Sequence, residues 1–231
     1  MLPDSPDVRS VVLEQLYPHL KGGQVLIDMS SIDPGVSREI GEKLAEKQVG
    51  MLDAPVSGGE PKAVDATLSF MVGGQDALFR QYAPLLKTMG RTVTYCLGAG
   101  NTVKLANQMI VAANIAAAAE GLMLARRNGV SPETVFHAVR GGLAGSAVME
   151  AKVPMMLRND TQPGFRIRLH IKDLKTALRA AADSGSPAPL SSVVMQQLLA
   201  VQEAGFSEAD HSAIAKYYEA LTGETLYEPD L

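Results

Sequence analysis

The fold is decided by two stretches, Asp53-Ala54-Pro55-Val56-Ser57-Gly58-Gly59 and Gly98-Ala99-Gly100-Asn101-Thr102-Val103-Lys104-Leu105-Ala106-Asn107-Gln108. The first has the pattern of a strand that enters a Gly-Gly turn, where backbone N–H groups can converge on an anion. The second follows a strand-like run and opens a long apolar helix with one lysine near its start. Strand patterns precede this point and helix patterns follow it.

Up to about residue 97, strand and helix patterns alternate. We expect strands over residues 25–30, 50–56, 67–72 and 92–97, and helices over residues 8–20, 33–48 and 76–89. Asp33, followed by a proline, is the expected N-cap of the second helix. Alternation of this kind predicts a mostly parallel sheet covered by helices.

From Asn101 onward only helix patterns remain. The first helix is expected to run to residue 128 and to end at Gly129, a usual C-terminal cap position. Further helices are expected over residues 132–140, 147–157, 171–184, 190–204 and 210–221. The predicted domain boundary lies between residues 98 and 99.

The composition excludes several function classes. The chain of 231 residues is 46% hydrophobic and 20% charged, with a formal net charge of −4 and no basic stripe, which argues against a nucleic-acid partner. Its single cysteine, Cys96, excludes an intrachain disulfide and suits a reducing cytoplasm; in an alternating run it is expected to be a buried, inert thiol. No signal peptide is visible at the N-terminus. The uncharged residues 105–119 are fewer than the ~20 of a membrane span, so a buried helix is expected.

One face of the long helix is polar. At 100° per residue, Lys104 shares a face with Asn101, Asn107, Gln108 and Asn114, while the rest of the helix is Ala, Val, Ile, Leu and Met. Burying a lysine without a purpose is costly, which favours a functional role. The alternative is that this lysine, in the first turn, extends its ammonium group to solvent.

The Gly98-Ala99-Gly100 run resembles the start of a dinucleotide fingerprint, with Glu120 at the expected distance for a ribose contact. Val103 stands where the third glycine belongs, and no strand pattern follows the helix. We therefore expect no phosphate loop here, and no Gly-x-Gly-x-x-Gly occurs in the 231 residues. No His, Cys and Asp cluster has metal-ligand spacing, so no metal is expected.

The two opening stretches, in this order, resemble the 3-hydroxyacid dehydrogenases, the family related to 3-hydroxyisobutyrate dehydrogenase. The resemblance implies an α/β fold with a truncated Rossmann-type, mostly parallel sheet followed by an all-α C-terminal domain. Residues 1–98 are then the C-terminal part of a dinucleotide-binding domain, and residues 99–231 a helical substrate and oligomerisation domain. The likeness covers essentially the whole chain but only the part of the family that follows its first βαβαβ half.

The same resemblance implies the substrate site. Lys104 matches the catalytic acid, and Ser57, Gly58 and Gly59 match the turn that holds the substrate carboxylate. Gln108 stands where the family usually has asparagine, so a substrate contact there has a reach altered by one methylene.

The resemblance also implies NAD or NADP as cofactor, with Leu2, Pro3, Ser31 and Lys172 lining the nicotinamide half of its site. The residues alone leave another interpretation of the Lys172 segment open, in which Asp173 and Lys175 form a solvated charged face.

Two further stretches, Arg140-Gly141-Gly142-Leu143-Ala144-Gly145-Ser146 and Gly164-Phe165-Arg166-Ile167-Arg168-Leu169-His170-Ile171-Lys172-Asp173-Leu174, resemble the tartronate semialdehyde (2-hydroxy-3-oxopropionate) reductases of this family. The resemblance implies reduction of a small 3-oxo acid with a nicotinamide cofactor, namely of tartronate semialdehyde to glycerate. Reduction of glyoxylate or succinic semialdehyde and oxidation of 3-hydroxyisobutyrate remain alternatives, as does a catalytically inactive oligomerising module that binds small carboxylates.

Two expectations concern the helical half. The long apolar helix has more apolar surface than one small domain is expected to cover, which predicts a homodimer or homotetramer, with no membrane partner. Asp210 is the expected cap of a helix in which His211 has a structural role.

Overall fold

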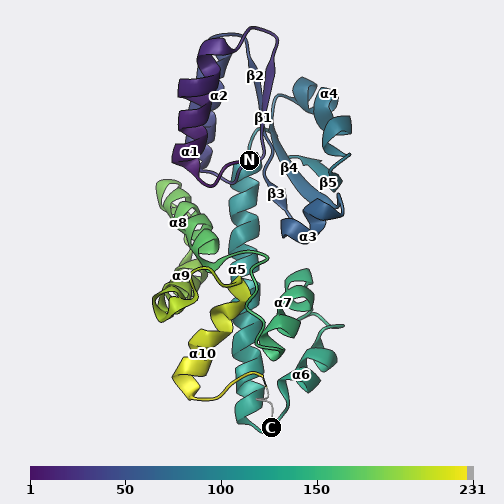
Figure 1. Ribbon diagram of the computed structural model, residues 1–231, viewed down its shortest axis with the longest axis vertical. Coiled ribbons are helices and arrows are strands. Elements are labelled where there is room, and N and C mark those ends of the chain that lie inside the picture. Colours follow the sequence, from purple (N-terminus) through teal and green to yellow (C-terminus); the bar gives the residue numbers. More distant parts are fainter. Residues whose placement is uncertain (228–231) are drawn as a thin grey trace. The chain divides into compact units, whose positions relative to one another are not determined.

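The computed structural model describes residues 1–227 and divides the chain into two compact units, Met1–Asn107 and Gln108–Leu231. The division falls inside one long helix, α5 (Gly100–Arg127), so that the first turns of this helix belong to the first unit. The domain boundary expected between residues 98 and 99 lies just before this helix. Figure 1 shows the elements of both units.

The first unit alternates helices and strands. Its elements in chain order are α1 (Ser5–Ser10), a wider π-helical stretch (Val11–Leu16), a 3-10 turn (Tyr17–His19), β1 (Val25–Asp28), α2 (Pro34–Ala45), β2 (Gly50–Asp53), β3 (Val56–Ser57), α3 (Gly59–Val64), β4 (Leu68–Gly74), α4 (Asp76–Leu86) and β5 (Gly90–Tyr95). The short helix α3 was not expected from the sequence.

The five-stranded sheet is mixed. β1 pairs with β2 in parallel and β4 pairs with β5 in parallel, whereas β4 runs antiparallel to both β2 and β3 on its other edge. The α/β class is confirmed, but the expectation of a mostly parallel sheet is wrong at these two pairings. The physical reason is the short connection: a parallel crossover needs a dozen or more residues, and α3 is too short to supply one.

Helices cover both faces of the sheet, as expected. Leu26 and Met51 on neighbouring strands pack with the buried side chains of α1 and α2, while Ile27 and Leu52 face the cluster under α4. Strand side chains alternate between faces, so β1 and β2 each contribute to both clusters.

Two helix starts show how local capping sets the boundaries. The Asp33 side chain accepts a hydrogen bond from the Gly35 N–H at 2.6 Å, which confirms the predicted cap of α2. The first helix begins earlier than the predicted residue 8, because Asp4 and Asp7 form a capping box around Ser5.

The second unit is helical in its described part. Its elements after α5 are α6 (Pro132–Val139), α7 (Ala147–Leu157), α8 (Ile167–Asp183), α9 (Pro189–Val201), a π-helical stretch (Gln202–Phe206), a 3-10 turn (His211–Ile214) and α10 (Ala215–Thr222). The helix expected over residues 210–221 is thus split into a 3-10 turn and α10.

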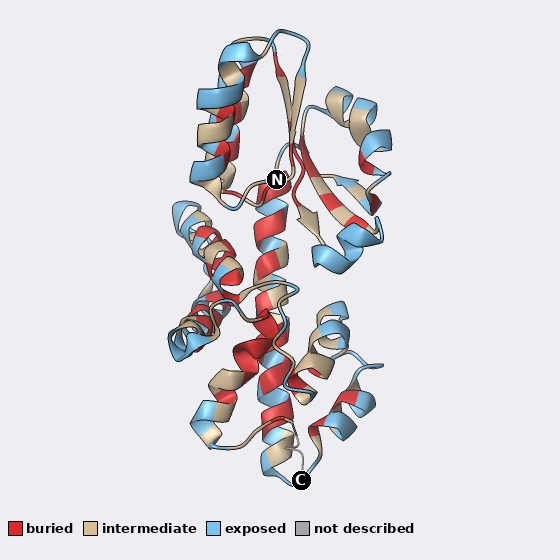
Figure 2. Cartoon of the chain, in the orientation of Figure 1, coloured by how far each residue is buried: buried red, intermediate tan, exposed pale blue. Residues whose placement is uncertain are grey.

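Helix α5 is the core helix of the second unit. By length and composition it is apolar enough to cross a membrane, but its side chains from Ala112 to Met123 form a core cluster with those of the other helices. Figure 2 shows buried residues along this helix. Most of the apolar side chains of this helix are therefore covered within the unit, whereas Ile110 and Leu124 are 62% and 68% exposed.

Cys96 follows β5 and is partly exposed rather than buried as expected. Its Sγ contacts the carbonyl oxygen of Thr94 at 3.5 Å. Burial still raises the pKa of the Cys96 thiol, and the charge of Asp53 adds to this effect. The thiol therefore stays protonated at neutral pH, which agrees with the expected lack of reactivity.

Candidate active site

The start of α5 is pressed against the sheet. A Cβ at Gly100 would lie 2.5 Å from the carbonyl oxygen of Asp53 and 2.9 Å from the backbone nitrogen of Gly73, so only glycine fits. Gly100 thus allows close packing of helix and sheet, whereas Gly98, in the same Gly98-Ala99-Gly100 run, is distinguished by its positive φ of 87°. The next element after α5 is the helix α6, so no strand–helix–strand unit contains this run. The expectation that it is no phosphate loop is consistent with both findings.

Asn101 anchors the first turn of α5 at two points. Its backbone N–H donates to Oδ2 of Asp53 at 2.8 Å, and its Oδ1 accepts from the Ile32 N–H at 3.0 Å. The side chain is 1% exposed. The strand β2 and the loop after β1 therefore both hold the turn from which Lys104 projects.

Three polar side chains of α5 are buried in one row. Asn101 is 1%, Lys104 7% and Gln108 4% exposed, at the i, i+3 and i+7 positions that share a helix face. The alternative in which Lys104 extends to solvent is contradicted by this burial. The row matches the polar face predicted from the sequence.

The Ser57-Gly58-Gly59 turn closes β3 and leads into α3. Gly58 has a φ of 135° and Gly59 a φ of 66°, backbone values that residues other than glycine rarely adopt. Both glycines are exposed and Ser57 is partly exposed, so their backbone N–H groups and the Ser57 hydroxyl can be approached by a ligand.

Gln108 belongs to a buried polar chain in the second unit. Its Nε2 donates to Oδ2 of Asp173 at 2.6 Å, and Oδ1 of Asp173 forms an ion pair with Nζ of Lys172 at 3.1 Å. Asp173 is 3% exposed, so the solvated charged face that remained open for this segment is contradicted. The direct contact of Gln108 with substrate stays a prediction.

Sequence reasoning assigned no functional role to Asp173. The signal that could have found it is its position three residues after His170 and four before Ala177, on the buried face of α8. A carboxylate on an apolar helix face needs a partner, and here it has two.

Leu2 and Pro3 lie beside the loop that follows β1. The Leu2 N–H donates to Oγ of Ser30 at 2.9 Å, and Ser30 is itself held by Asp28, whose Oδ1 accepts from the Ser30 hydroxyl at 2.6 Å. Pro3 is exposed and Ser31 partly exposed at the carboxyl end of β1. This end of a parallel strand is where α/β sheets bind nucleotides, so these residues fit one end of a dinucleotide.

His211 has the structural role expected of it. It follows the cap residue Asp210, whose side chain accepts from the Ser212 N–H, and its Nδ1 lies 3.0 Å from Nδ1 of His170. Nε2 of His170 lies 3.2 Å from the Gln108 carbonyl oxygen, which can only accept. In the neutral His170 ring the Nε2 proton is therefore the donor, and Nδ1 accepts from His211.

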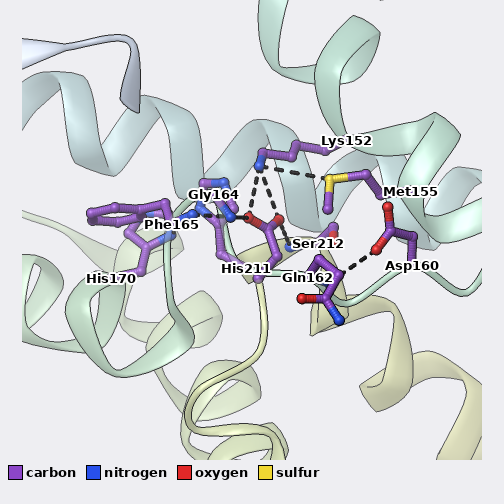
Figure 3. Close-up of polar contacts among 10 residues, drawn as sticks. Lys152, Met155, Asp160, Gln162, Gly164, Phe165, His170, His211 and Ser212 are labelled. Carbon is purple, nitrogen blue, oxygen red and sulfur yellow. Dashed lines mark hydrogen bonds and ion pairs between the residues drawn. The ribbon is translucent and has the colours of Figure 1, made fainter. Parts of the chain in front are cut away.

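Asp210 is the most heavily bonded carboxylate in the described residues of the second unit. Its two oxygens lie 2.9 Å from Nζ of Lys152, and it also accepts from the N–H groups of Gly164, Phe165 and Ser212. Figure 3 shows these contacts to the two oxygens of one carboxylate group. Burial alone would raise the pKa of Asp210, but attraction to His211 and the bonds from Lys152 and the backbone outweigh it and lower the pKa. The cluster is structural, because its charges are satisfied internally.

Two family models together match almost the whole chain. The model described as the NAD binding domain of 6-phosphogluconate dehydrogenase matches residues 1–98, and the model described as the NAD-binding domain of NADP-dependent 3-hydroxyisobutyrate dehydrogenase matches residues 98–218. Both are NAD-binding models, so the chain is of the oxidoreductase class that uses NAD or NADP.

Individual relatives agree with the models. The chain is 37% identical to the 2-hydroxy-3-oxopropionate reductase of Escherichia coli, over 98% of this chain and 79% of that protein. The solved structure of Mycobacterium tuberculosis 3-hydroxyisobutyrate dehydrogenase with L-serine has a TM-score of 0.85 at 31% identity, over 96% of this chain and 78% of that one. That of the Salmonella typhimurium 3-hydroxyisobutyrate dehydrogenase has a TM-score of 0.83 at 29% identity, over 93% and 76%.

The chain belongs to the family of NAD(P)-dependent 3-hydroxyacid dehydrogenases related to 3-hydroxyisobutyrate dehydrogenase. Other members among its relatives are an L-threonate dehydrogenase of Cupriavidus necator, 32% identical, and an NAD-dependent L-serine dehydrogenase of Pseudomonas aeruginosa, 31% identical. The resemblance stated from the sequence is thus confirmed at the level of the family.

Proposed function

We propose that this protein reduces a small 3-oxo acid, with the conversion of tartronate semialdehyde to glycerate as its main reaction. The observation that carries the proposal is the burial of the Lys104 side chain in one row with Asn101 and Gln108. A buried cation on an otherwise apolar helix has a large desolvation cost, which a role in the reaction explains. The choice of substrate is supported by the E. coli reductase, 37% identical over most of both chains.

The proposal assigns a role in the reaction to the cofactor, to Lys104 and to the residues that hold the substrate. Bound NADH or NADPH supplies the hydride that reduces the carbonyl carbon. The Lys104 ammonium group stabilises the negative charge that develops on the carbonyl oxygen and delivers a proton to it. Ser57 and the N–H groups of Gly58 and Gly59 hold the substrate carboxylate, and Gln108, fixed by its bond to Asp173, orients the substrate.

Four other residues are proposed to bind the cofactor. Leu2, Pro3 and Ser31 would line the nicotinamide end of the cofactor site at the carboxyl end of β1, which their positions beside Ser30 support. Lys172, the family's second lysine by sequence match, is held in one orientation by its ion pair with Asp173.

A panel of substrates tests the proposal. We expect the highest kcat/KM with tartronate semialdehyde, measured by nicotinamide absorbance with both NADH and NADPH. Glyoxylate, succinic semialdehyde, 3-hydroxyisobutyrate, L-threonate and L-serine are the rivals. A higher kcat/KM with any of these assigns a different substrate to the same site. No turnover with any of them, together with binding of small carboxylates, would favour the inactive module instead.

We also propose that the protein is a homodimer or homotetramer in the cytoplasm. Large apolar side chains remain exposed on α5, where Ile110 is 62% and Leu124 68% exposed, and on α9, where Leu190 is 62% and Val193 57% exposed. Exposed apolar surface of this kind marks protein interfaces. Light scattering at micromolar concentration is expected to give at least the mass of a dimer, and a monomer at that concentration would contradict the proposal.

A further inference from the structure

Asp53 lies at the end of β2, in register with Asp28 on the parallel strand β1. It is 8% exposed, and its Oδ2 accepts the backbone N–H of Asn101 at 2.8 Å. Asn101 is the second residue of α5, where backbone N–H groups have no partner within the helix. A carboxylate from a distant strand therefore caps the helix that carries Lys104.

Asp53 is closely packed against the backbone of Gly73 and Gly100. A Cβ added at Gly73 would overlap Oδ1 of Asp53, and one added at Gly100 would lie 2.5 Å from the Asp53 carbonyl oxygen. On the other side of the turn, the Ile32 N–H is bonded to the Asn101 side chain. The first turn of α5 is thus held by β2 and by the loop after β1, and Lys104 lies three residues further along the same helix face.

The ionised form of the Asp53 carboxyl group lowers the stability of the fold relative to the protonated form. Stability alone therefore does not explain why an aspartate stands at this position. Burial raises the pKa of Asp53 to about 6, and the negative charge of Asp28 adds to this, while the bonds from Asn101 oppose it. The folded state then binds a proton more tightly than the unfolded state between about pH 4 and pH 6. The free energy of unfolding therefore falls as the pH rises through this window.

We propose that Asp53 is a positioning residue, whose carboxylate fixes the first turn of α5 and thereby sets the position of the Lys104 ammonium group. The inference rests on the proposed function only in its effect on catalysis. A neutral asparagine would fill the same space and accept the same N–H, but its bond would be about half as strong as the charge-assisted one. The negative charge is thus what distinguishes a residue that positions the first turn of α5 from one that only fills the space beside it.

Other charged or titratable groups lie near Asp53 and influence its titration curve. Asp28 faces it from β1, Cys96 interacts with it from the end of β5, and Arg38 of α2 lines the same cavity of about 160 Å³. Asn101 and Thr102 are the polar side chains that α5 adds to this region.

NMR on the whole chain tests the inference without any activity. In the wild type we expect the Asn101 amide proton and the Lys104 ε-carbon, labelled with ¹³C and assigned with Lys104→Arg, both to shift with a midpoint near pH 6. In Asp53→Asn both shifts are expected to disappear, and hydrogen exchange of the Asn101 amide to rise about tenfold, as for a weakened helix cap. Asp76→Asn is the matched control, since Asp76 is an exposed partner of Arg80 in the same unit.

The Lys104 signal decides the inference. It is overturned if this signal is constant between pH 5 and pH 7 in the wild type, or if it titrates unchanged in Asp53→Asn. If Asp53→Asn does not fold, the wild-type titration alone gives the answer.

Catalysis provides a second measurement. With an active substrate, Asp53→Asn is expected to lower kcat about tenfold with little change in KM, and to remove the loss of kcat below about pH 6 that is expected in the wild type. An unchanged kcat and pH profile would contradict positioning by Asp53. No activity in the wild type would instead contradict the proposed function, and the NMR result would still stand.

Discussion

Replacing Lys104 by alanine is expected to lower kcat by about 10²–10⁴, the usual contribution of a positioned acid. The side chain is buried in a row with Asn101 and Gln108. Binding of NADH or NADPH, measured by calorimetry, is expected to change little, because the residues assigned to the cofactor lie elsewhere in the sequence.

A second variant separates charge from proton delivery. Lys104→Arg keeps the positive charge, but a guanidinium group does not release its proton in proteins. We therefore expect it to retain part of the charge stabilisation and to lose proton delivery, with kcat between those of the wild type and Lys104→Ala. Lys175→Ala, on the exposed part of α8, is the matched control. More than a third of the wild-type kcat in Lys104→Ala would remove this lysine from the mechanism.

The largest effect on stability is expected from Lys152→Met. Asp210 is fully buried and paired with Lys152, whose side chain is 16% exposed. Removing one partner leaves a buried charge, which typically costs about 3–5 kcal/mol of unfolding free energy. Urea unfolding followed by circular dichroism measures the loss, and Arg140→Met, which breaks a half-exposed pair with Glu150, is expected to cost less than about 1 kcal/mol.

The pH dependence gives an independent check of the same pair. The pKa of Asp210 is lowered in the folded protein, so the carboxylate contributes stability above its unfolded pKa near 3.8 and loses it as the pH falls through the folded pKa. In Lys152→Met this loss at acid pH is expected to be smaller. Equal stability of Lys152→Met and the wild type at pH 7 would show that the ion pair contributes nothing.

Local sequence patterns predicted most of the helices and strands of this protein. Period-2 and period-3.6 patterning placed the strands, the long helix that ends at Arg127 and the cap at Asp33, because each depends on residues close together in the chain. The polar face of Lys104 and Gln108 followed from helix geometry alone. The motif around Ser57 identified the family, which the relatives confirm.

Other features came only from the tertiary structure. The antiparallel pairing of β4, the bonds of Asp173 to Gln108 and of Asp210 to Lys152, and the cap of α5 by Asp53 each join residues far apart in the sequence. Periodicity reports which face of an element is apolar, but not which distant group a buried carboxylate will meet. The sequence by itself therefore predicted most of the elements, the family and the polar helix face that carries Lys104. The partners that hold that lysine's helix in place were decided by folding, because a buried charge must find its compensating donors wherever the packed backbone brings them.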